Sequence, residues 1–326
     1  MNAEAAMPGG GGAGQDAVAG EIVRFRRVTR RFGARMALLD ASCSLGAGVV
    51  GLVGPNGAGK TTWLRLAAGL IQPTTGEVRW RGDLPRRHPD LDNRIALCAD
   101  RDALPPDASA WQLLRDHLRI AGLSAAAAGE RAEASLHRLG LQDRMERPLG
   151  QLSRGQRQRV KLALTFALPA DLYLLDEPQN ALDPVWRLEV AALVRAARDA
   201  GALVVVSSHI LEEVEAIADR LVVLYRSRIV AMGPKDAVRL QLGRAGVALR
   251  VEASDVRALG RALIGHPAVL RLEVSEGALR VAGDDLSAIQ RGLAAAVLTS
   301  GVRVSAVETE GDDLTSVFRA LGQEVR

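Results

Sequence analysis

The first two thirds of the chain alternate between short apolar runs and longer stretches in which apolar residues recur at helical spacing. Four runs rich in valine and leucine are almost uninterrupted by polar residues: residues 49–53, 172–175, 202–206 and 221–224. Such runs are typical of strands whose two faces are both buried. The helices expected among them lie at residues 62–68, 186–200 and 211–219. Strands that alternate with helices predict an α/β fold with a mostly parallel sheet.

Two further patterns interrupt this α/β region. Shorter segments of extended character are expected at residues 22–25, 38–45, 77–80 and 95–98. A turn-like interruption is expected at residues 29–33. Residues 101–167 instead carry apolar residues at helical spacing, such as Trp111, Leu114 and Leu118. We therefore expect a largely helical insertion within the α/β core.

A second unit begins beyond about residue 233. Its pattern predicts strand, helix, strand, strand, helix and strand at residues 247–251, 255–263, 269–274, 278–281, 286–299 and 302–307. This order is that of a small ferredoxin-like α+β domain, to which we assign residues 240–326, with a final helix at residues 313–321. Residues 1–19 hold a glycine run and little apolar surface, so they are expected to form a disordered tail.

Length and composition narrow the class of protein. The 326 residues suit one large domain and a smaller one, and 48% hydrophobic with 3% aromatic residues predicts an aliphatic core. A net charge of +4, from 42 basic and 38 acidic residues, describes a mixed surface and not a nucleic-acid-binding arm. Cys43 and Cys98 lack metal-binding spacing and are expected to be core thiols in a reducing compartment.

No secretory signal and no apolar run of about 18–20 residues is found in the sequence. We therefore expect a soluble chain that reaches a membrane only through a partner.

A glycine-rich loop joins the strand at residues 49–53 to the helix that follows. Its spacing, G-x-x-x-x-G-K-[ST], forms a phosphate-binding loop when it stands between a strand and a helix. Backbone N–H groups would surround the phosphates, Lys60 would reach the β- and γ-phosphates, and the Thr61 hydroxyl would ligate Mg²⁺. The predicted phosphate-binding residues are Gly54, Pro55, Asn56, Gly57, Ala58, Gly59, Lys60, Thr61 and Thr62.

The rarity of lysine in this chain lowers the chance that the match to the phosphate-loop pattern is accidental. Lys60, Lys161 and Lys235 are the only lysines among 42 basic residues. A chain that otherwise uses arginine keeps lysine in the loop, where a compact point charge suits a phosphate. The alternative interpretation is a glycine-rich turn that enters a helix and binds nothing.

Asp176 and Glu177 follow directly after the apolar run at residues 172–175. In open parallel sheets, ligands bind at the carboxyl ends of the strands. We predict that Asp176 holds Mg²⁺, directly or through water, and that Glu177 orients and deprotonates the attacking water as the general base. The alternative interpretation is an ordinary acidic turn before Pro178.

A second candidate anion site precedes the helix that starts near residue 154. Ser153 is a good N-cap, Gly155 leaves the backbone open, and Gln156 follows it. A helix N-terminus with a free hydroxyl can bind an anion. Because one phosphate loop does not need two such sites in one chain, this site is expected to serve a nucleotide held by another subunit. The alternative is a capped helix without a ligand.

These motifs, together with residues 180–183 and 208–209, occur in the order and spacing of ATP-binding cassette (ABC) ATPases, which the chain resembles over residues 20–232. The resemblance implies a P-loop NTPase cassette with a helical subdomain at about residues 101–167. It also implies a head-to-tail dimer with a second ATPase subunit, identical or different, and two ATP molecules at the interface. The partner's nucleotide would contact Ser153, Gly155 and Gln156, and Asp183 would couple the two sites.

The resemblance implies roles for three further residues. His209 would contact the γ-phosphate and help Glu177 in catalysis, and Phe32 would stack on adenine. Asp100 stands where family members usually place a glutamine that links Mg²⁺ and water to the transmembrane partner. The candidate metal ligands are therefore Thr61, Asp176 and Asp100. The C-terminal unit, through residues 314–318, is similar to the domain appended to cassette subunits of bacterial drug-export systems.

The function implied is that of the ATP-binding and ATP-hydrolysing subunit of an ABC transporter, with ATP and Mg²⁺ as cofactors. It would dimerise on ATP and drive separate transmembrane permease subunits, as an exporter by preference. It would lie in the cytoplasm, held at the inner face of the membrane by the permease.

Two alternatives stay open. One is a soluble cassette ATPase that acts on nucleic acid or ribosomes. Such proteins usually carry two cassettes, long coiled-coil insertions or zinc motifs, which this sequence lacks, so no nucleic-acid partner is expected. The other is a nucleotide-gated regulator with weak hydrolysis, which the unusual Asp100 motivates.

Overall fold

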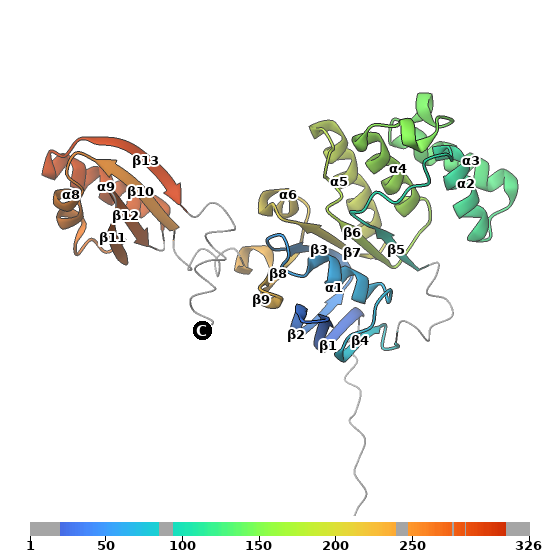
Figure 1. The fold of residues 1–326 in the computed structure, drawn as a ribbon, viewed down its shortest axis with the longest axis horizontal. Coiled ribbons are helices and arrows are strands. Elements are labelled where there is room, and N and C mark those ends of the chain that lie inside the picture. The colour runs from blue at the N-terminus through green and yellow to red at the C-terminus, as the bar shows by residue number, and fades with distance from the viewer. Residues whose placement is uncertain (1–19, 85–93, 239–246, 276, 284, 311–326) are drawn as a thin grey trace, which may run out of the picture.

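The structure is a computed structural model that describes residues 20–84, 94–238, 247–275, 277–283 and 285–310 (Figure 1). The tail expected at residues 1–19, the final helix expected at residues 313–321 and the similarity at residues 314–318 lie outside the described residues.

A six-stranded sheet forms the centre of the first part of the chain, with the order β5-β6-β7-β3-β8-β9 (Figure 1). Five neighbouring strands run parallel, and β9 at the edge runs antiparallel to β8. The strands are β3 (Gly48–Val53), β5 (Ile95–Cys98), β6 (Leu172–Asp176), β7 (Leu203–Ser208), β8 (Arg220–Tyr225) and β9 (Arg228–Pro234). The mostly parallel sheet predicted from the apolar runs is thus confirmed.

The buried strands explain why their sequences are apolar without alternation. Leu174 and Val205 point into a cluster on one face of the sheet, and their neighbours Leu175 and Val206 point into another on the opposite face. Because successive side chains of a strand point to opposite faces, a strand covered on both sides must be apolar at every position.

A second, three-stranded antiparallel sheet packs on the first of these faces, with helix α1 (Lys60–Ala67) in the same hydrophobic cluster. Its order is β2-β1-β4, and its strands are β1 (Glu21–Phe32), β2 (Arg35–Gly46) and β4 (Thr75–Trp80). The Phe25 ring from β1 stacks on the Trp63 ring from α1, with centroids 4.5 Å apart. This packing fixes the helix that carries the glycine loop at its start.

Helices cover the other face: α2, α3 and α4, which lie within residues 101–167, gather beside the sheet, and α5 and α6 share their hydrophobic cluster (Figure 1). The helices are α2 (Ala110–Ile120), α3 (Ala125–Arg138), α4 (Arg154–Phe166), α5 (Pro184–Asp199) and α6 (Leu211–Glu215). Short 3₁₀ turns lie at Gln142–Arg144 and Leu149–Gln151. The helices of the insertion begin at N-cap serines, whose hydroxyls satisfy backbone N–H groups that lack an intrahelical partner: Ser109, Ser124 and Ser153.

The C-terminal unit has the element order β-α-β-β-α-β that the sequence indicates. It consists of β10 (Val247–Ala253), α8 (Val256–Leu263), β11 (Arg271–Ser275), β12 (Ala278–Gly283), α9 (Leu286–Ser300) and β13 (Val304–Glu310). The four strands form an antiparallel sheet in the order β11-β12-β10-β13, and the two helices share one core with its inner face.

Two local predictions are wrong. Residues 29–33 do not interrupt the first strand, because β1 continues to Phe32 and pairs with β2 to the hairpin turn at Gly33, which has a φ of 57°. The helix expected at residues 211–219 ends at Glu215. The chain then turns tightly so that the Asp219 carboxylate accepts a hydrogen bond from the Val49 N–H at 2.8 Å.

Two other expectations concern the whole chain. Among the described residues, no helix is long and apolar enough to cross a membrane. Cys43 and Cys98 are free and buried, as expected of core thiols. Burial raises the pKa of Cys43 to about 12 and that of Cys98 to about 11, so neither thiol ionises near neutral pH.

Replacement of the fully buried Leu174 by alanine is expected to lower the free energy of unfolding by about 2–5 kcal/mol, because a cavity is left between packed strands and helices. The matched control is Leu188→Ala on α5, where the side chain is 71% exposed and the expected change is within about 0.5 kcal/mol. Urea unfolding of the full chain, followed by circular dichroism, measures both. Equal effects would contradict this assignment of the core.

Candidate functional site

The predicted motifs meet at one edge of the six-stranded sheet. The glycine loop follows β3, residues 207–209 end or follow β7, and Asp176 and Glu177 end or follow β6. These three strands are parallel neighbours in the order β6-β7-β3. Their carboxyl ends therefore lie side by side, as the sequence predicts.

The glycines of the loop are required by close packing. A Cβ on Gly54 would lie 2.3 Å from the carbonyl oxygen of Leu224. Gly59 has a φ of 111°, and a Cβ there would lie 2.4 Å from the carbonyl oxygen of Ala37. Side chains at these positions would push the loop away from the neighbouring strands β8 and β2.

Lys60 opens helix α1 and is 6% exposed. Its Nζ donates a hydrogen bond to the carbonyl oxygen of Gly54 at 2.7 Å and lies 3.3 Å from Oε1 of Glu177. The loop thus curls around its own lysine, and the ammonium stands between the loop and the acidic pair.

Asp176 is 2% exposed, and both of its carboxylate oxygens accept hydrogen bonds. The Thr61 hydroxyl donates to Oδ2 at 2.7 Å, and the Ser207 hydroxyl donates to Oδ1 at 2.7 Å. The Thr61 hydroxyl and the Asp176 carboxylate are therefore neighbours, as a pair of ligands to one cation must be.

Glu177 is held at three points. Its backbone N–H donates to Oγ of Ser207 at 3.1 Å, Oε1 faces Lys60, and Oε2 lies 2.9 Å from Nδ1 of His209. Its φ of 49° lies in the left-handed region, which non-glycine residues adopt at a cost of about 1–3 kcal/mol. The backbone here turns the carboxylate toward the lysine and the histidine at the expense of local strain.

A cavity of about 380 Å³ lies against the glycine loop. Its lining includes these predicted residues: Phe32, Asn56, Gly57, Gly59, Lys60, Thr61, Thr62, Asp100, Asp176 and Glu177. Phe32 is 44% exposed at one end of the cavity, and the Arg30 guanidinium lies 4.4 Å from its ring centroid. Phe32 and Asp100 thus line the same cavity as the glycine loop, and the roles that the resemblance implies for them stay predictions.

The second candidate anion site does not line this cavity. The Ser153 hydroxyl accepts the Gln156 N–H at 3.2 Å, and the Gln156 side chain accepts the Ser153 N–H at 2.9 Å. Gly155 packs so closely on the neighbouring loop that a Cβ would lie 2.6 Å from the carbonyl oxygen of Ala181. Asp183 caps α5 by accepting the Trp186 N–H at 3.2 Å.

A divalent cation would find oxygen donors here. No group of three or more His, Cys, Asp or Glu side chains that could hold a metal occurs in the part of the chain that the structure describes. Mg²⁺ is usually bound through one or two carboxylates together with substrate phosphates and waters. The Thr61 hydroxyl and the Asp176 carboxylate fit that pattern, and Asp100 lies in the same cavity.

Ser207 is the functional residue that the sequence did not single out. It is fully buried and connects Asp176 with the N–H of Glu177 through one hydroxyl. Its position opposite Asp176 follows from the register of β6 and β7, which pairs these two residues. Only knowledge of that register could have found it, because Ser207 lies 31 positions further along the chain.

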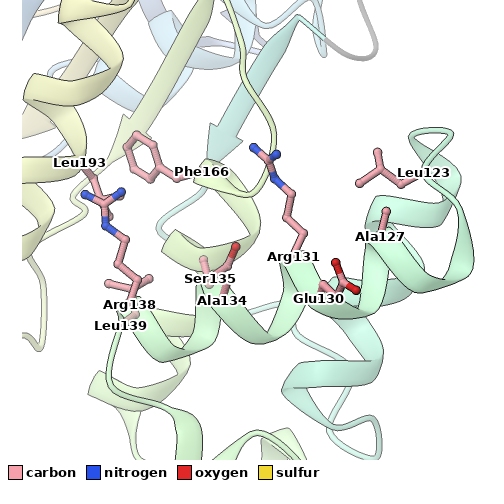
Figure 2. A pocket seen from close by; sticks show the side chains of 11 residues that line it. Leu123, Ala127, Glu130, Arg131, Ala134, Ser135, Arg138, Leu139, Phe166 and Leu193 are labelled. Atoms are coloured by element: carbon pink, nitrogen blue, oxygen red, sulfur yellow. The ribbon is translucent and has the colours of Figure 1, made fainter.

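A larger cavity, of about 570 Å³, lies between α3, α4 and α5 and holds none of the predicted site residues. Figure 2 shows Arg131 and Arg138 extending from α3 past Phe166. Both arginines are already engaged, because Arg131 donates to the carbonyl oxygen of Ala167 at 2.7 Å and Arg138 pairs with Glu189 at 2.8 Å. Its lining combines apolar side chains with the two engaged arginines, Glu130 and Ser135, and contains neither a glycine loop nor an acidic pair at a strand end.

Comparisons with known proteins identify the family. The family described as ABC transporter matches residues 38–180. The Nod factor export ATP-binding protein I of Cupriavidus pinatubonensis is 33% identical over 225 residues, which cover 68% of this chain and 69% of that protein. The aliphatic sulfonates import ATP-binding protein SsuB 1 of Burkholderia lata is 35% identical over 254 residues, which cover 77% and 75%.

A solved structure, that of the ATP binding subunit of an ABC transporter, aligns with a TM-score of 0.63 at 27% identity. It covers 68% of this chain and 93% of that one. The fold is therefore that of a P-loop ATP-binding cassette. The chain belongs to the ATP-binding proteins of the ABC transporter family, and as such it is an ATPase that binds ATP.

Ser207→Ala is expected to lower the free energy of unfolding by about 1–3 kcal/mol, because it leaves the buried Glu177 N–H without its acceptor. ATP hydrolysis should fall as well, since both acidic residues lose a contact. The control is Ser305→Ala, whose hydroxyl donates to the carbonyl oxygen of Glu252 at an exposed position. Urea unfolding and phosphate release measure the two effects. If both variants behave like the natural chain, Ser207 does not organise the site.

Proposed function

We propose that the chain hydrolyses ATP in a dimer of cassettes and thereby drives a separate membrane permease, by preference as an exporter. The observation that carries the proposal is the position of Glu177, held between Lys60 and His209 directly beside the phosphate loop. This is an arrangement in which a carboxylate, a lysine and a histidine converge on the place of a terminal phosphate.

The hydrolytic roles follow from these contacts. Lys60 leaves Glu177 for the β- and γ-phosphates, because a phosphate in the loop competes for the same ammonium. Glu177 then orients the attacking water and accepts its proton as the general base. His209 keeps the Glu177 carboxylate in place and contacts the γ-phosphate. Thr61 and Asp176 would hold Mg²⁺, whose positive charge would stabilise the negative charge that develops during hydrolysis.

Phe32 binds the other end of the nucleotide. One face of its ring is covered by the Arg30 guanidinium, and the ring lines the cavity of the glycine loop. A phenyl ring supplies the π face that stacking on adenine needs. The cation held against the ring limits its motion before adenine arrives.

The dimer is proposed because part of the expected nucleotide contacts lies outside the cavity of the same chain. Ser153, Gly155 and Gln156 are exposed or half-buried at the start of α4, and the Ser153 hydroxyl is turned to its own helix end. These residues contact the nucleotide of a second subunit, which is another copy or a related ATPase. Asp183, packed near Gly155 through the loop of Ala181, couples the two sites.

We propose residues 20–232 as the cassette, with its helical subdomain at about residues 101–167, and residues 240–326 as an accessory domain. The order β11-β12-β10-β13 with all neighbours antiparallel supports a ferredoxin-like class for that domain. Residues 1–19 stay assigned as a tail.

The permease is proposed to bind a groove beside Asp100. This groove has a volume of about 430 Å³ and lies between β5 and α4, with an apolar lining that includes Leu97, Leu104 and Leu113. Ala103, at its margin, is exposed. A cytoplasmic segment of the permease bound here would place the chain at the inner face of the membrane. Among the relatives, one is named for export and another for import, so the preference for export rests on the sequence alone.

Glu177→Gln is expected to abolish turnover and to trap an ATP-bound dimer, because glutamine keeps the shape of the side chain and cannot accept the proton. Phosphate release and size-exclusion chromatography with ATP measure the two effects. The control is Glu189→Gln, a half-buried glutamate that is paired with Arg138 outside the nucleotide cavity. Normal hydrolysis by Glu177→Gln would show that the general base is a different group.

Ala103→Glu is expected to reduce co-purification with a polytopic membrane protein while ATP binding is kept, because a charge then enters the apolar groove. The matched control is Ala125→Glu, an exposed position at the start of α3 outside the groove. Affinity purification from detergent-solubilised membranes measures the association. Co-purification with RNA or ribosomes in place of a membrane protein would overturn the transport proposal.

A further inference from the structure

Lys161 is a buried lysine that the reaction described above does not use. It lies in α4, about two turns beyond Ser153, and is 9% exposed. Its Nζ donates to the carbonyl oxygen of Ala99 at 2.8 Å and to that of Asp100 at 3.1 Å. A buried ammonium needs acceptors, so the charge and the backbone of these two residues hold each other in place.

The backbone that Lys161 holds separates two cavities. Ala99 and Arg101 line the groove between β5 and α4, and so does Lys161 itself. Asp100, which stands between them in sequence, lines the nucleotide cavity instead. The lysine therefore holds this segment from the side of the groove, while Asp100 lines the nucleotide cavity.

A second cation of α4 attaches the same segment. The Arg157 guanidinium donates through Nε to the carboxylate of Asp102 and through Nη1 to the carbonyl oxygen of Leu152. Residues 99–102 are thus tied to α4 at two points one helical turn apart. The helix that begins with Ser153 and the segment that carries Asp100 are expected to move as one body.

The contacts between α4 and residues 99–102 bear on the position of the Asp100 carboxylate, because aspartate has a short side chain. A single methylene separates its carboxylate from the backbone, so the place of the carboxylate is set by the place of the Asp100 Cα. The two hydrogen bonds from Lys161 to the carbonyl oxygens of Ala99 and Asp100 hold that Cα in place. Lysine suits the task better than arginine, because a compact ammonium can reach two adjacent carbonyl oxygens from within a packed helix.

We propose that Lys161 is a positioning residue, which holds the backbone of Ala99 and Asp100 so that the Asp100 carboxylate acts in the nucleotide cavity. This inference rests on the proposed function, in that Asp100 is taken to act on the cation or the water there. On this proposal, a partner bound in the groove would affect hydrolysis through the hydrogen bonds between α4 and residues 99–102.

The test compares Lys161→Met in the full chain with Lys235→Met. Lys235 also donates from Nζ to a backbone carbonyl oxygen, that of Glu215 at 3.3 Å, but it lines neither cavity. Lys161→Met is expected to lower kcat about tenfold to a hundredfold with little change in the KM for ATP, as for the loss of a group that orients a ligand of the cation. Lys235→Met should keep both values.

A readout without nucleotide accompanies the kinetics. In hydrogen–deuterium exchange of the nucleotide-free chain, the peptide that covers residues 99–102 should exchange faster in Lys161→Met and not in Lys235→Met. Lys161→Arg, which keeps the charge and the donors, should restore part of the protection and part of kcat. Thermal unfolding of each variant identifies any general loss of folding, and a variant with both normal protection and normal kcat would overturn the proposal.

The double variant Lys161→Met with Asp100→Ala separates the inference from the function on which it rests. If Lys161 acts through Asp100, the double variant should be no slower than Asp100→Ala, because the two losses then share one cause. Additive losses would show that Lys161 acts elsewhere and would overturn the inference. A fall in kcat for Asp100→Ala without one for Lys161→Met would do the same, whereas failure of the ATPase proposal would appear first in Glu177→Gln.

Discussion

The structure depends most directly on one buried positive charge. The Lys60 ammonium is 6% exposed, and such a charge is tolerated only where acceptors surround it. The carbonyl oxygen of Gly54 and the carboxylate of Glu177 are those acceptors. The Gly54 carbonyl oxygen reaches the lysine because the glycine loop turns back on itself after β3. The Glu177 carboxylate reaches it because β6 belongs to the same sheet and ends at the same level. A phosphate in the loop would compete with Glu177 for the same ammonium, so in the proposed mechanism this charge also controls when Glu177 is free to act as the base.

The register of the parallel strands fixes the relative positions of the glycine loop, the acidic pair and the histidine. Asp176 is paired with Ser207, and Val53 is paired with Ser208, so the loop, the acidic pair and the histidine leave the sheet at one level. A slip of one residue would turn every side chain of a strand to the opposite face. The apolar runs that fill two cores therefore also set the register of the site. Packing far from the nucleotide determines which oxygen of Asp176 meets Thr61 and which meets Ser207.

This division explains what the sequence could predict. The glycine loop and the pair after β6 were found because local spacing encodes them: a loop needs its glycines and its lysine within a few positions. The hydrogen bond from Ser207 to Asp176 and the one from Lys161 to the Asp100 carbonyl oxygen were not predicted. Both join residues that are distant in the chain, so they depend on strand register or on the placement of a helix. The extension of β1 to Phe32 was missed for a similar reason. Arginines at positions 30 and 31 weaken the local strand pattern, and cross-strand pairing with β2 outweighs it.

The hydrogen bonds at the start of α4 leave the Ser153 hydroxyl able to make the contact that we propose with a second subunit. The Ser153 oxygen accepts a hydrogen bond from the Gln156 N–H, and the Gln156 side chain accepts one from the Ser153 N–H. These two backbone N–H groups at the start of the helix therefore have acceptors within the same chain. A serine hydroxyl that accepts one hydrogen bond still has its own hydrogen to donate. The cap therefore stabilises the helix without using the donor that a phosphate from another subunit would need. Gly155 rests on the carbonyl oxygen of Ala181, and Lys161, further along the same helix, donates to the carbonyl oxygen of Asp100. Helix α4 therefore contacts both the loop that precedes Asp183 and the segment that carries Asp100.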